Sequence, residues 1–310
     1  MRVAVIDLGT NTCNLLIADI DQKGFDILHQ SKQWVKLGDS QIKSNEISHE
    51  GLDRILFSLE AFRKIVENHG AEVIRIVATS AIRHAQNRVE ILETIGKRTG
   101  WIIKIIPGED EARLIFQGVL LALEKIETPS VIMDIGGGSN ELILAEKDSI
   151  IWKESKHTGM ARVINQFALS DPLHPEELEI LKAFFTARHA SAIEECKKNG
   201  VETLIGCSGA FDTLADMIEE VSPGTRNRRQ QQIRISDFCR IYDKLLFSTL
   251  TERKQMKGMD MMRVHLIVPA VIFIHQFMAQ TGIKTIIQTD FALREGVLYE
   301  IREQDILPAG

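Results

Sequence analysis

The chain alternates short apolar runs with longer stretches in which apolar residues recur at helical spacing. In the first half, apolar runs bounded by Gly, Pro or polar turn residues predict strands at 3–7, 14–20, 25–36, 73–78 and 101–106. Residues 49–68 carry an amphipathic helical pattern, and shorter helices are predicted at about 87–98 and 109–124. This alternation predicts an α/β fold.

The second half restarts the same pattern at Ser130. Strands are predicted at 131–134, 140–146, 149–154, 201–206 and 285–288. Helices are predicted at about 159–169, 175–196, 208–220, 236–248, 263–280 and 292–304. The apolar run 266–274 falls well short of the roughly 20 residues that span a bilayer, so it predicts a buried helix. We therefore expect one α/β plan used twice, with domains at 1–125 plus 292–310 and at 126–291.

Two segments, 3–20 and 131–146, share one design: an apolar strand that ends in Asp, a turn of Gly, Ser, Thr or Asn, and a second apolar strand. Such turns expose backbone N–H groups and suit phosphate. The second loop is the sharper signal, because Gly136, Gly137 and Gly138 weaken a sheet unless the backbone must approach a ligand closely. Asp134 and Glu141 flank this turn and suit Mg²⁺, which prefers oxygen ligands; the alternative is a tight structural turn.

Three further segments carry candidate chemistry. Arg83 lies just beyond a predicted strand and suits bidentate phosphate binding, although a surface ion pair explains it equally well. Glu111 lies in the first turns of a helix, where the helix dipole alone favours an acid. A strand-turn-helix segment with an anion-attracting helix start contains Gly206, Ser208 and Gly209, and a plain turn is the alternative.

Charge and composition narrow the function classes. The net charge of −6 argues against a general nucleic-acid binder, and the basic segment 226–234 is read either as an anion-binding patch or as a solvated loop. The four cysteines have no metal-ligand or disulfide spacing, which favours reduced thiols in a cytoplasmic protein. No predicted segment is long enough to span a membrane, so we expect no membrane partner.

Six motifs together resemble the exopolyphosphatase and guanosine pentaphosphate phosphohydrolase family, in their order and spacing from residue 3 to about 300. They are IDLGTNTCNLLI, ATSAIRHAQN, GEDEARLIFQG, DIGGGSNEL, GCSGAFDTLA and ALREGVLYE. The resemblance implies the fold of the actin, sugar kinase and heat-shock-70 ATPase superfamily, with two ribonuclease H-like domains flanking an active-site cleft. It also implies that the final helix, with Arg294-Glu295-Gly296, packs on the first domain, and that the chain is a short two-domain form.

The resemblance assigns roles to matching positions. Glu111 is implied as the general base for the attacking water, with Arg83 stabilising the transferred phosphoryl group. Asp134 and Glu141 are implied as Mg²⁺ ligands, which gives Asp134 a part in catalysis. The phosphate-binding set comprises Asp7, Gly9, Thr10, Asn11, Gly136 to Ser139, Gly206, Ser208 and Gly209.

Three positions depart from the family pattern. Asn14 stands where a basic residue is common, Asn140 replaces a Thr, and Ala210 replaces another Thr. We expect an exopolyphosphatase that is a homodimer. The alternatives are hydrolysis of guanosine pentaphosphate to the tetraphosphate, or a sensor that binds either anion without cleaving it. A sugar kinase or ATPase is a more distant alternative from the superfamily likeness.

Overall fold

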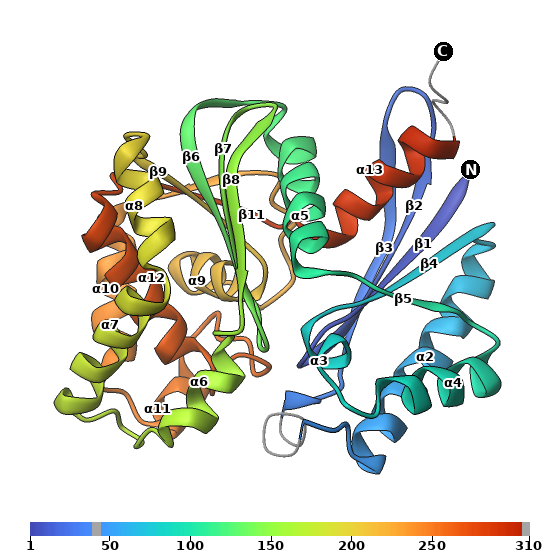
Figure 1. Cartoon of the computed structure of the whole chain (residues 1–310), viewed down its shortest axis with the longest axis horizontal. Coiled ribbons are helices and arrows are strands. Elements are labelled where there is room, and N and C mark those ends of the chain that lie inside the picture. Colours follow the sequence, from blue (N-terminus) through green and yellow to red (C-terminus); the bar gives the residue numbers. More distant parts are fainter. Residues whose placement is uncertain (39–44, 306–310) are drawn as a thin grey trace. The chain divides into compact units, whose positions relative to one another are not determined.

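The computed structural model describes residues 1–38 and 45–305 (Figure 1). The chain divides into two compact units. Unit 1 comprises Met1–Gly118 together with the segment that begins at Leu293, and unit 2 comprises Val119–Ala292. The first boundary therefore falls inside the helix that follows Pro107, whereas the sequence placed it at 125.

Unit 1 is built on a five-stranded sheet in which three antiparallel strands adjoin two parallel ones. β1 is central, antiparallel to β2 and parallel to β4. The strand order is β3 (Phe25–Trp34), β2 (Thr12–Ile20), β1 (Arg2–Leu8), β4 (Val73–Ala78) and β5 (Ile103–Ile105). Strand β1 is almost wholly buried, so both of its faces are covered.

Helices cover the two faces of this sheet. The buried side chains of α2 (His49–His69) and α4 (Arg88–Thr99) share a core with Ala4, Ile6 and Leu8 of β1. Helix α13 (Leu293–Asp305) contacts β1 and β2, which is the packing that the family resemblance implied. The two remaining helices of unit 1 are α3 (Ser80–Arg83) and α5 (Gly108–Leu123), which continues into unit 2.

Unit 2 repeats the strand order of unit 1 and adds one edge strand. Its sheet runs β10 (Gln231–Ile233), β11 (Thr285–Thr289), β9 (Thr203–Cys207), β6 (Ile126–Ile135), β7 (Asn140–Lys147) and β8 (Ser149–Lys156). Strands β6, β7 and β8 are antiparallel, and β9 is parallel to β6. The expected fold class, α/β with two sheets of ribonuclease H-like order, is confirmed.

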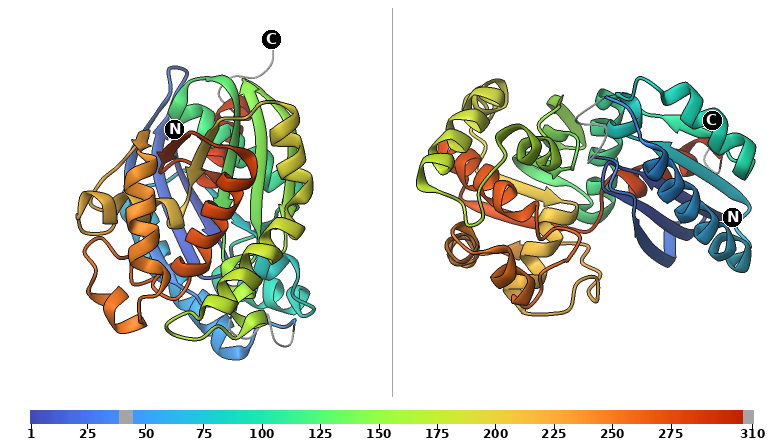
Figure 2. Two further views of the ribbon diagram at one scale, coloured as in Figure 1. Left: turned by 90° about the vertical axis from the view of Figure 1, so that its left-hand side faces the viewer. Right: turned by 90° about the horizontal axis from the view of Figure 1, so that it is seen from below.

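Seven helices are described in unit 2, and the larger ones lie together on one side of its sheet (Figures 1 and 2). They are α6 (Met160–Phe167), α7 (Pro175–Arg188), α8 (Ala190–Lys198), α9 (Gly209–Glu219), α10 (Ile235–Leu246), α11 (Leu250–Gln255) and α12 (Ile267–Thr281). Helix α12 contacts α7, α8 and α10 and is buried along most of its length. The prediction of a buried helix at 266–274 is confirmed.

Several sequence predictions of elements were wrong. The single helix predicted at 175–196 is two helices, because the backbone leaves the helical conformation at His189, whose side chain is completely buried. The short elements α3, β10 and α11 were not predicted. Three-residue strands and one-turn helices carry too few residues to show a period.

Candidate active site

The parallel strands of unit 1 bring three sequence-predicted residues to one edge of the sheet. Asp7 lies near the end of β1, Arg83 follows β4 in α3, and Glu111 follows β5 in the first turn of α5. Since β4 is parallel to both β1 and β5, which flank it, the carboxyl ends of all three strands lie at the same edge. In sheets of this kind ligands bind outside that edge.

Arg83 and Glu111 form a nearly buried ion pair. Arg83 Nη1 donates to Glu111 Oε2 at 2.7 Å and to the carbonyl oxygen of Ile106 at 2.8 Å. The side chains are only 12% and 9% exposed. Arg83 Nη2 is buried and has no hydrogen-bond partner within the described part of the chain. A buried guanidinium donor without a partner is costly, so this nitrogen is the natural ligand for an incoming anion.

Asp7 is the second group with an unsatisfied atom. Asn14, which faces Asp7 across β1 and β2, donates from Nδ2 to Asp7 Oδ2 at 3.1 Å. Asp7 Oδ1 is buried and accepts no hydrogen bond from the residues described. Burial raises the pKa of Asp7 to about 6, against the opposing effects of the Asn14 hydrogen bond and the charge of Arg294, while the charge of Glu295 adds to the rise.

The turn between β1 and β2, which is the first of the two predicted phosphate-binding loops, is held by hydrogen bonds to its carbonyl groups. The Gly9 amide donates to the Thr12 carbonyl at 3.0 Å, which closes the turn. The carbonyls of Thr10 and Asn11 accept from backbone amides that follow β3, at 2.7 Å for Leu37 and 2.9 Å for Val35. These hydrogen bonds tie the backbone of the loop to the segment that follows β3.

In unit 2, Asp134 and Glu141 lie directly opposite each other on β6 and β7, so their side chains share one face of the sheet. Both are buried, at 8% and 2% exposure. Ser208 donates to Asp134 Oδ2 at 2.8 Å, and Ser155 donates to Glu141 Oε1 at 2.7 Å, which fixes both carboxylates. Mg²⁺ is typically bound by one or two carboxylates plus waters and phosphate oxygens, so this pair fits the expected metal.

No cluster of three or more His, Cys, Asp or Glu side chains able to hold a metal occurs among residues 1–38 and 45–305. A metal here would therefore depend on the substrate for further ligands, as Mg²⁺ at phosphate-binding sites commonly does.

The glycine loop between Asp134 and Glu141 is oriented by the start of α6. The carbonyls of Gly136 and Gly137 each accept from backbone amides at 3.0 Å, those of Met160 and Ala161 respectively, and the Gly138 carbonyl accepts from Arg162 Nε at 2.9 Å. In a trans peptide the N–H points opposite to the C=O. The amides of Gly137, Gly138 and Ser139 are therefore turned away from the start of α6, and neighbouring backbone amides of this kind suit an anion.

The start of α9 contributes the remaining predicted residues. Ser208 is the N-cap residue, with a positive φ of 66°, and its hydroxyl reaches Asp134. A Cβ on Gly206 would lie 2.1 Å from the ring of Phe211, so this glycine is required by packing. A Cβ on Gly209 would lie 2.2 Å from the guanidinium of Arg263, which therefore lies against the N-terminus of α9. Sequence reasoning missed Arg263, because no local motif distinguishes it.

A protein-family model describing the Ppx/GppA phosphatase family matches residues 16–305. The chain belongs to that family. The crystal structure of an exopolyphosphatase from Cytophaga hutchinsonii is similar, with 33% identity, 98% of each chain covered and a TM-score of 0.93. A structure described as the Aquifex aeolicus PPX-GPPA enzyme has 25% identity, covers 97% of this chain and 99% of its own, and has a TM-score of 0.82. A curated relative from Haemophilus influenzae, named putative exopolyphosphatase, is 26% identical over 97% of this chain and 92% of its own.

The three departures from the family pattern have identifiable positions in the structure. Asn14 donates to Asp7, so an amide lies beside that carboxylate. Asn140 is completely buried and donates to the carbonyl and hydroxyl oxygens of Thr158. Ala210 is buried in the first turn of α9.

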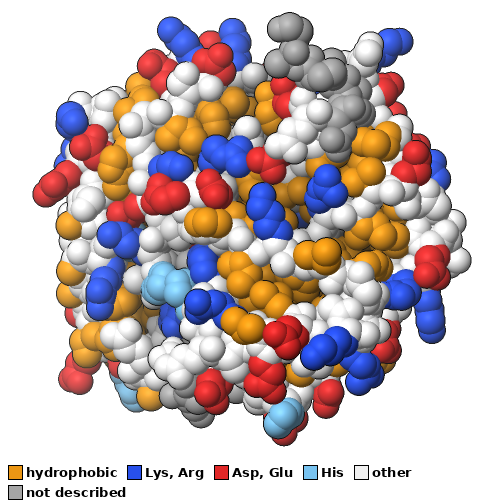
Figure 3. Space-filling view, turned by 45° about the vertical axis from the view of Figure 1, so that its right-hand side comes forward, with side chains coloured by type: hydrophobic (Ala, Val, Ile, Leu, Met, Phe, Trp, Pro, Cys, Tyr) orange, Lys and Arg blue, Asp and Glu red, His pale blue; other side chains and the backbone are white. Residues whose placement is uncertain are grey.

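The arginines of the basic segment 226–234 are paired within unit 2. Arg228 is buried and donates to Asp216 at 2.8 Å and to Glu219 at 2.7 Å. Arg229 lies over the ring of Phe291, and Arg226 and Arg234 each lie 3.9 Å from an acid. These contacts favour a structural role for the segment over an anion-binding patch. Acidic and basic side chains are also interspersed on the face shown in Figure 3.

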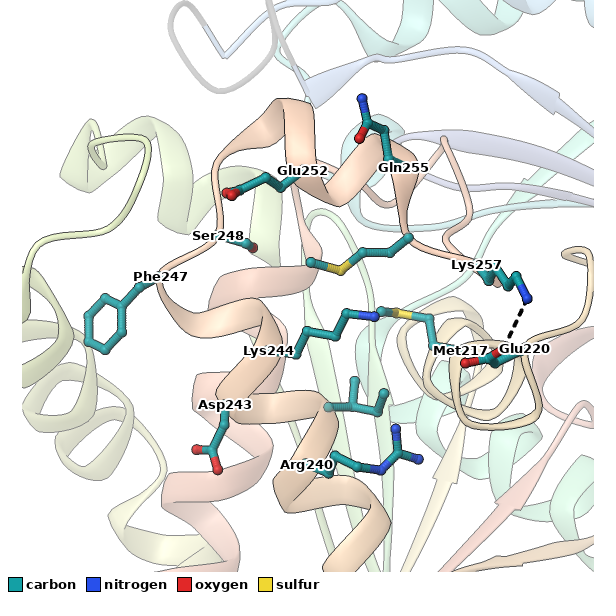
Figure 4. A pocket seen from close by; sticks show the side chains of 12 residues that line it. Met217, Glu220, Arg240, Asp243, Lys244, Phe247, Ser248, Glu252, Gln255 and Lys257 are labelled. Carbon is teal, nitrogen blue, oxygen red and sulfur yellow. Dashed lines mark hydrogen bonds and ion pairs between the residues drawn. The ribbon is translucent and has the colours of Figure 1, made fainter.

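A separate cavity of about 710 Å³ lies in unit 2 beside α9, α10 and α11 (Figure 4). It contains none of the sequence-predicted site residues. Two of its acidic side chains already have partners: Glu220 pairs with Lys257, and Glu252 belongs to the capping box of α11. None of the helices within residues 1–38 and 45–305 has the length and hydrophobicity needed to span a bilayer.

Proposed function

We propose that this protein is an exopolyphosphatase, which hydrolyses the terminal phosphoanhydride bond of inorganic polyphosphate and releases orthophosphate. The observation that carries the proposal is the glycine loop, whose carbonyls are held by α6 so that the amides of Gly137, Gly138 and Ser139 are turned the other way. The family membership and the names of the relatives support the same activity.

The proposal gives each side chain a task. Glu111 accepts a proton from the attacking water. Arg83 holds Glu111 in place through Nη1 and offers its partnerless Nη2 to an oxygen of the transferred phosphoryl group. The loop amides of 137–139 and the first loop, with Gly9, Thr10 and Asn11, bind the neighbouring phosphates. Such a reaction depends mostly on positioning and electrostatics and needs no covalent intermediate.

Asp134 and Glu141 are the residues that would hold Mg²⁺, with Ser208 and Ser155 fixing the two carboxylates. Bound Mg²⁺ neutralises charge on phosphate oxygens. Arg263, placed against the start of α9, supplies a further positive charge beside Ser208.

The substrate is tested by measuring phosphate release side by side from long polyphosphate, short polyphosphate and guanosine pentaphosphate. We expect release from polyphosphate with Mg²⁺ present. Release only from guanosine pentaphosphate would transfer the assignment to that activity. Binding of these anions without any release would make the protein a sensor, and neither binding nor release would contradict every version of the proposal.

The role of Glu111 is tested by Glu111→Gln. We expect this variant to bind tripolyphosphate as the wild type does and to lose about 10²- to 10⁴-fold in kcat, the usual range for removal of a general base. Asp110→Asn is the matched control, because Asp110 is exposed in the same turn of α5 and should be nearly as active as the wild type. Equal activity of Glu111→Gln and Asp110→Asn would remove Glu111 from catalysis.

We further propose a homodimer of the cytoplasm. The four cysteines are free thiols, three of them buried, which supports a reducing compartment. Light scattering on the purified protein tests the oligomeric state, and a single mass of one chain would contradict the dimer.

A further inference from the structure

Four buried polar side chains form a hydrogen-bonded network, here called the polar network, next to the glycine loop. Asn140 Nδ2 donates to Thr158, at 2.7 Å to the carbonyl oxygen and at 3.1 Å to Oγ1. Thr158 Oγ1 is 3.1 Å from His189 Nε2, and His189 Nδ1 is 3.1 Å from Glu154 Oε1. Asn140 and His189 are completely buried, and Thr158 and Glu154 are nearly so.

The hydrogen bonds among these four side chains follow one donor-to-acceptor order. Glu154 also pairs with Lys156 at 3.2 Å, so its carboxylate accepts and His189 Nδ1 carries the donated hydrogen. The tautomer with its hydrogen on Nδ1 leaves Nε2 as an acceptor for the Thr158 hydroxyl. Its oxygen in turn accepts from Asn140. Each bond thus fixes the orientation of the next.

Thr158 is joined directly to the segment that holds the loop. It precedes Gly159, where a Cβ would lie 2.4 Å from the backbone of Gly137 and Gly138. The next three residues, 160–162, hold the loop carbonyls. Asn140 follows Ser139 immediately. The polar network therefore links Asn140, which follows the loop, to residues 158–162, which contact the loop.

His189 lies at a break between two helices. Helices α7 and α8 meet at this residue, and its ring stacks on Phe273 at a centroid distance of 4.5 Å. In such apolar surroundings a hydrophobic residue would pack at least as well, because buried polar networks gain little net stability. A role in stability alone therefore does not account for the network, whereas fixing one arrangement of a backbone does.

We infer that His189 and Thr158 are positioning residues for the phosphate-binding loop: through Asn140 and Gly159 they hold the amides of residues 137–139 in the orientation that binds a phosphate chain. The inference rests on the proposed function for the identity of the anion. Neither residue is expected to touch the substrate. Their effect on the reaction is exerted through the backbone of the loop.

The test compares two substitutions of one residue. Thr158→Val keeps the shape of the side chain and removes the hydroxyl, whereas Thr158→Ser keeps the hydroxyl. Thr186→Val is the matched control, since Thr186 on α7 also makes two hydrogen bonds, donating to the Lys182 carbonyl and accepting from Gln276, and neither partner belongs to the loop.

We expect Thr158→Val to raise KM about tenfold, the equivalent of one lost hydrogen bond, with a smaller change in kcat. Tripolyphosphate binding, measured by calorimetry in EDTA so that no turnover is needed, should weaken by a similar factor. Amide hydrogen exchange in a peptide covering 136–140 should become faster. Thr158→Ser should restore all three quantities, and Thr186→Val should leave them unchanged. His189→Phe, which removes the acceptor of the Thr158 hydroxyl, should act in the same direction as Thr158→Val.

Exchange and tripolyphosphate binding that are the same in Thr158→Val and Thr158→Ser would overturn the inference. It would also be overturned if Thr186→Val speeds exchange in 136–140 as much as Thr158→Val does, because the effect would then be general loosening. If neither the wild type nor any variant releases phosphate, but exchange and tripolyphosphate binding respond as expected, the inference stands and the proposed hydrolase activity fails.

Discussion

Replacing Asp7 by Asn should stabilise the protein at neutral pH, although Asp7 belongs to the candidate site. Burial raises the pKa of Asp7 from a usual value of 3.8 to about 6. The folded state therefore binds the proton more tightly than the unfolded state does, and this group's contribution to stability falls as the pH rises from about 4 to 6. About two pKa units at 1.36 kcal/mol each give a cost of about 3 kcal/mol above pH 6.

The asparagine side chain in Asp7→Asn would carry no charge at any pH, and it could still accept the hydrogen bond from Asn14. We expect urea unfolding to show Asp7→Asn more stable than the wild type by up to about 3 kcal/mol at pH 8, with the difference shrinking toward zero near pH 4. The variant should also release phosphate more slowly, because a charge kept at such a cost is characteristic of functional sites.

Asp19→Asn supplies a control of opposite sign. The hydrogen bond that Arg2 donates to Asp19 lowers the pKa of this carboxyl group. The contribution of Asp19 to the free energy of unfolding is therefore present at neutral pH and is lost as the pH falls below about 4. Asp19→Asn should therefore be less stable than the wild type at pH 8. A pH-independent difference between Asp7→Asn and the wild type, or a less stable Asp7→Asn at pH 8, would refute the reasoning about Asp7.

Three further predictions follow from close contacts and from the carboxylate pair. Gly159→Ala should cost about 1–3 kcal/mol and raise KM for polyphosphate, because the new methyl would meet the loop backbone; Gly24→Ala, with nothing within 4 Å, should do neither. Gly296→Ala should lower the melting temperature by separating α13 from Leu114 of α5, with a KM near that of the wild type. Glu141→Gln should raise the Mg²⁺ concentration for half-maximal activity at least about tenfold, and an unchanged Mg²⁺ requirement would remove Glu141 as a ligand.

The fold and the site loops were accessible from sequence for specific reasons. The strands of both units show period-two or continuous apolar runs, and both loops repeat one Asp-x-Gly design, so pattern alone located them. Asp134 and Glu141 flank one predicted turn between two strands, and the register of β6 and β7 places them opposite each other.

The pairing of Arg83 with Glu111 was beyond sequence reasoning. The two residues lie 28 positions apart and meet because β4 and β5 are parallel neighbours whose following segments converge. The structure shows an ion pair for Arg83, nearly buried rather than on the surface, and it places Glu111 in the first turn of α5, as the local alternatives for each residue proposed. They do not compete with function, because one buried ion pair can both satisfy a guanidinium nitrogen and leave another nitrogen for a ligand.

The clearest limit of local patterns is at residues 140 and 189. Read alone, Asn140 is an amide in place of a family Thr, and residues 175–196 form one helix. The single-helix interpretation is wrong because the backbone leaves the helical conformation at His189, whereas the effect of Asn140 on activity stays a prediction. The buried amide nitrogen of Asn140 donates to Thr158, whose hydroxyl oxygen lies 3.1 Å from His189 Nε2. Asn140 and the helix break at His189 are therefore two parts of one hydrogen-bonded arrangement. This arrangement cannot be recognised until three segments far apart in the sequence are brought together.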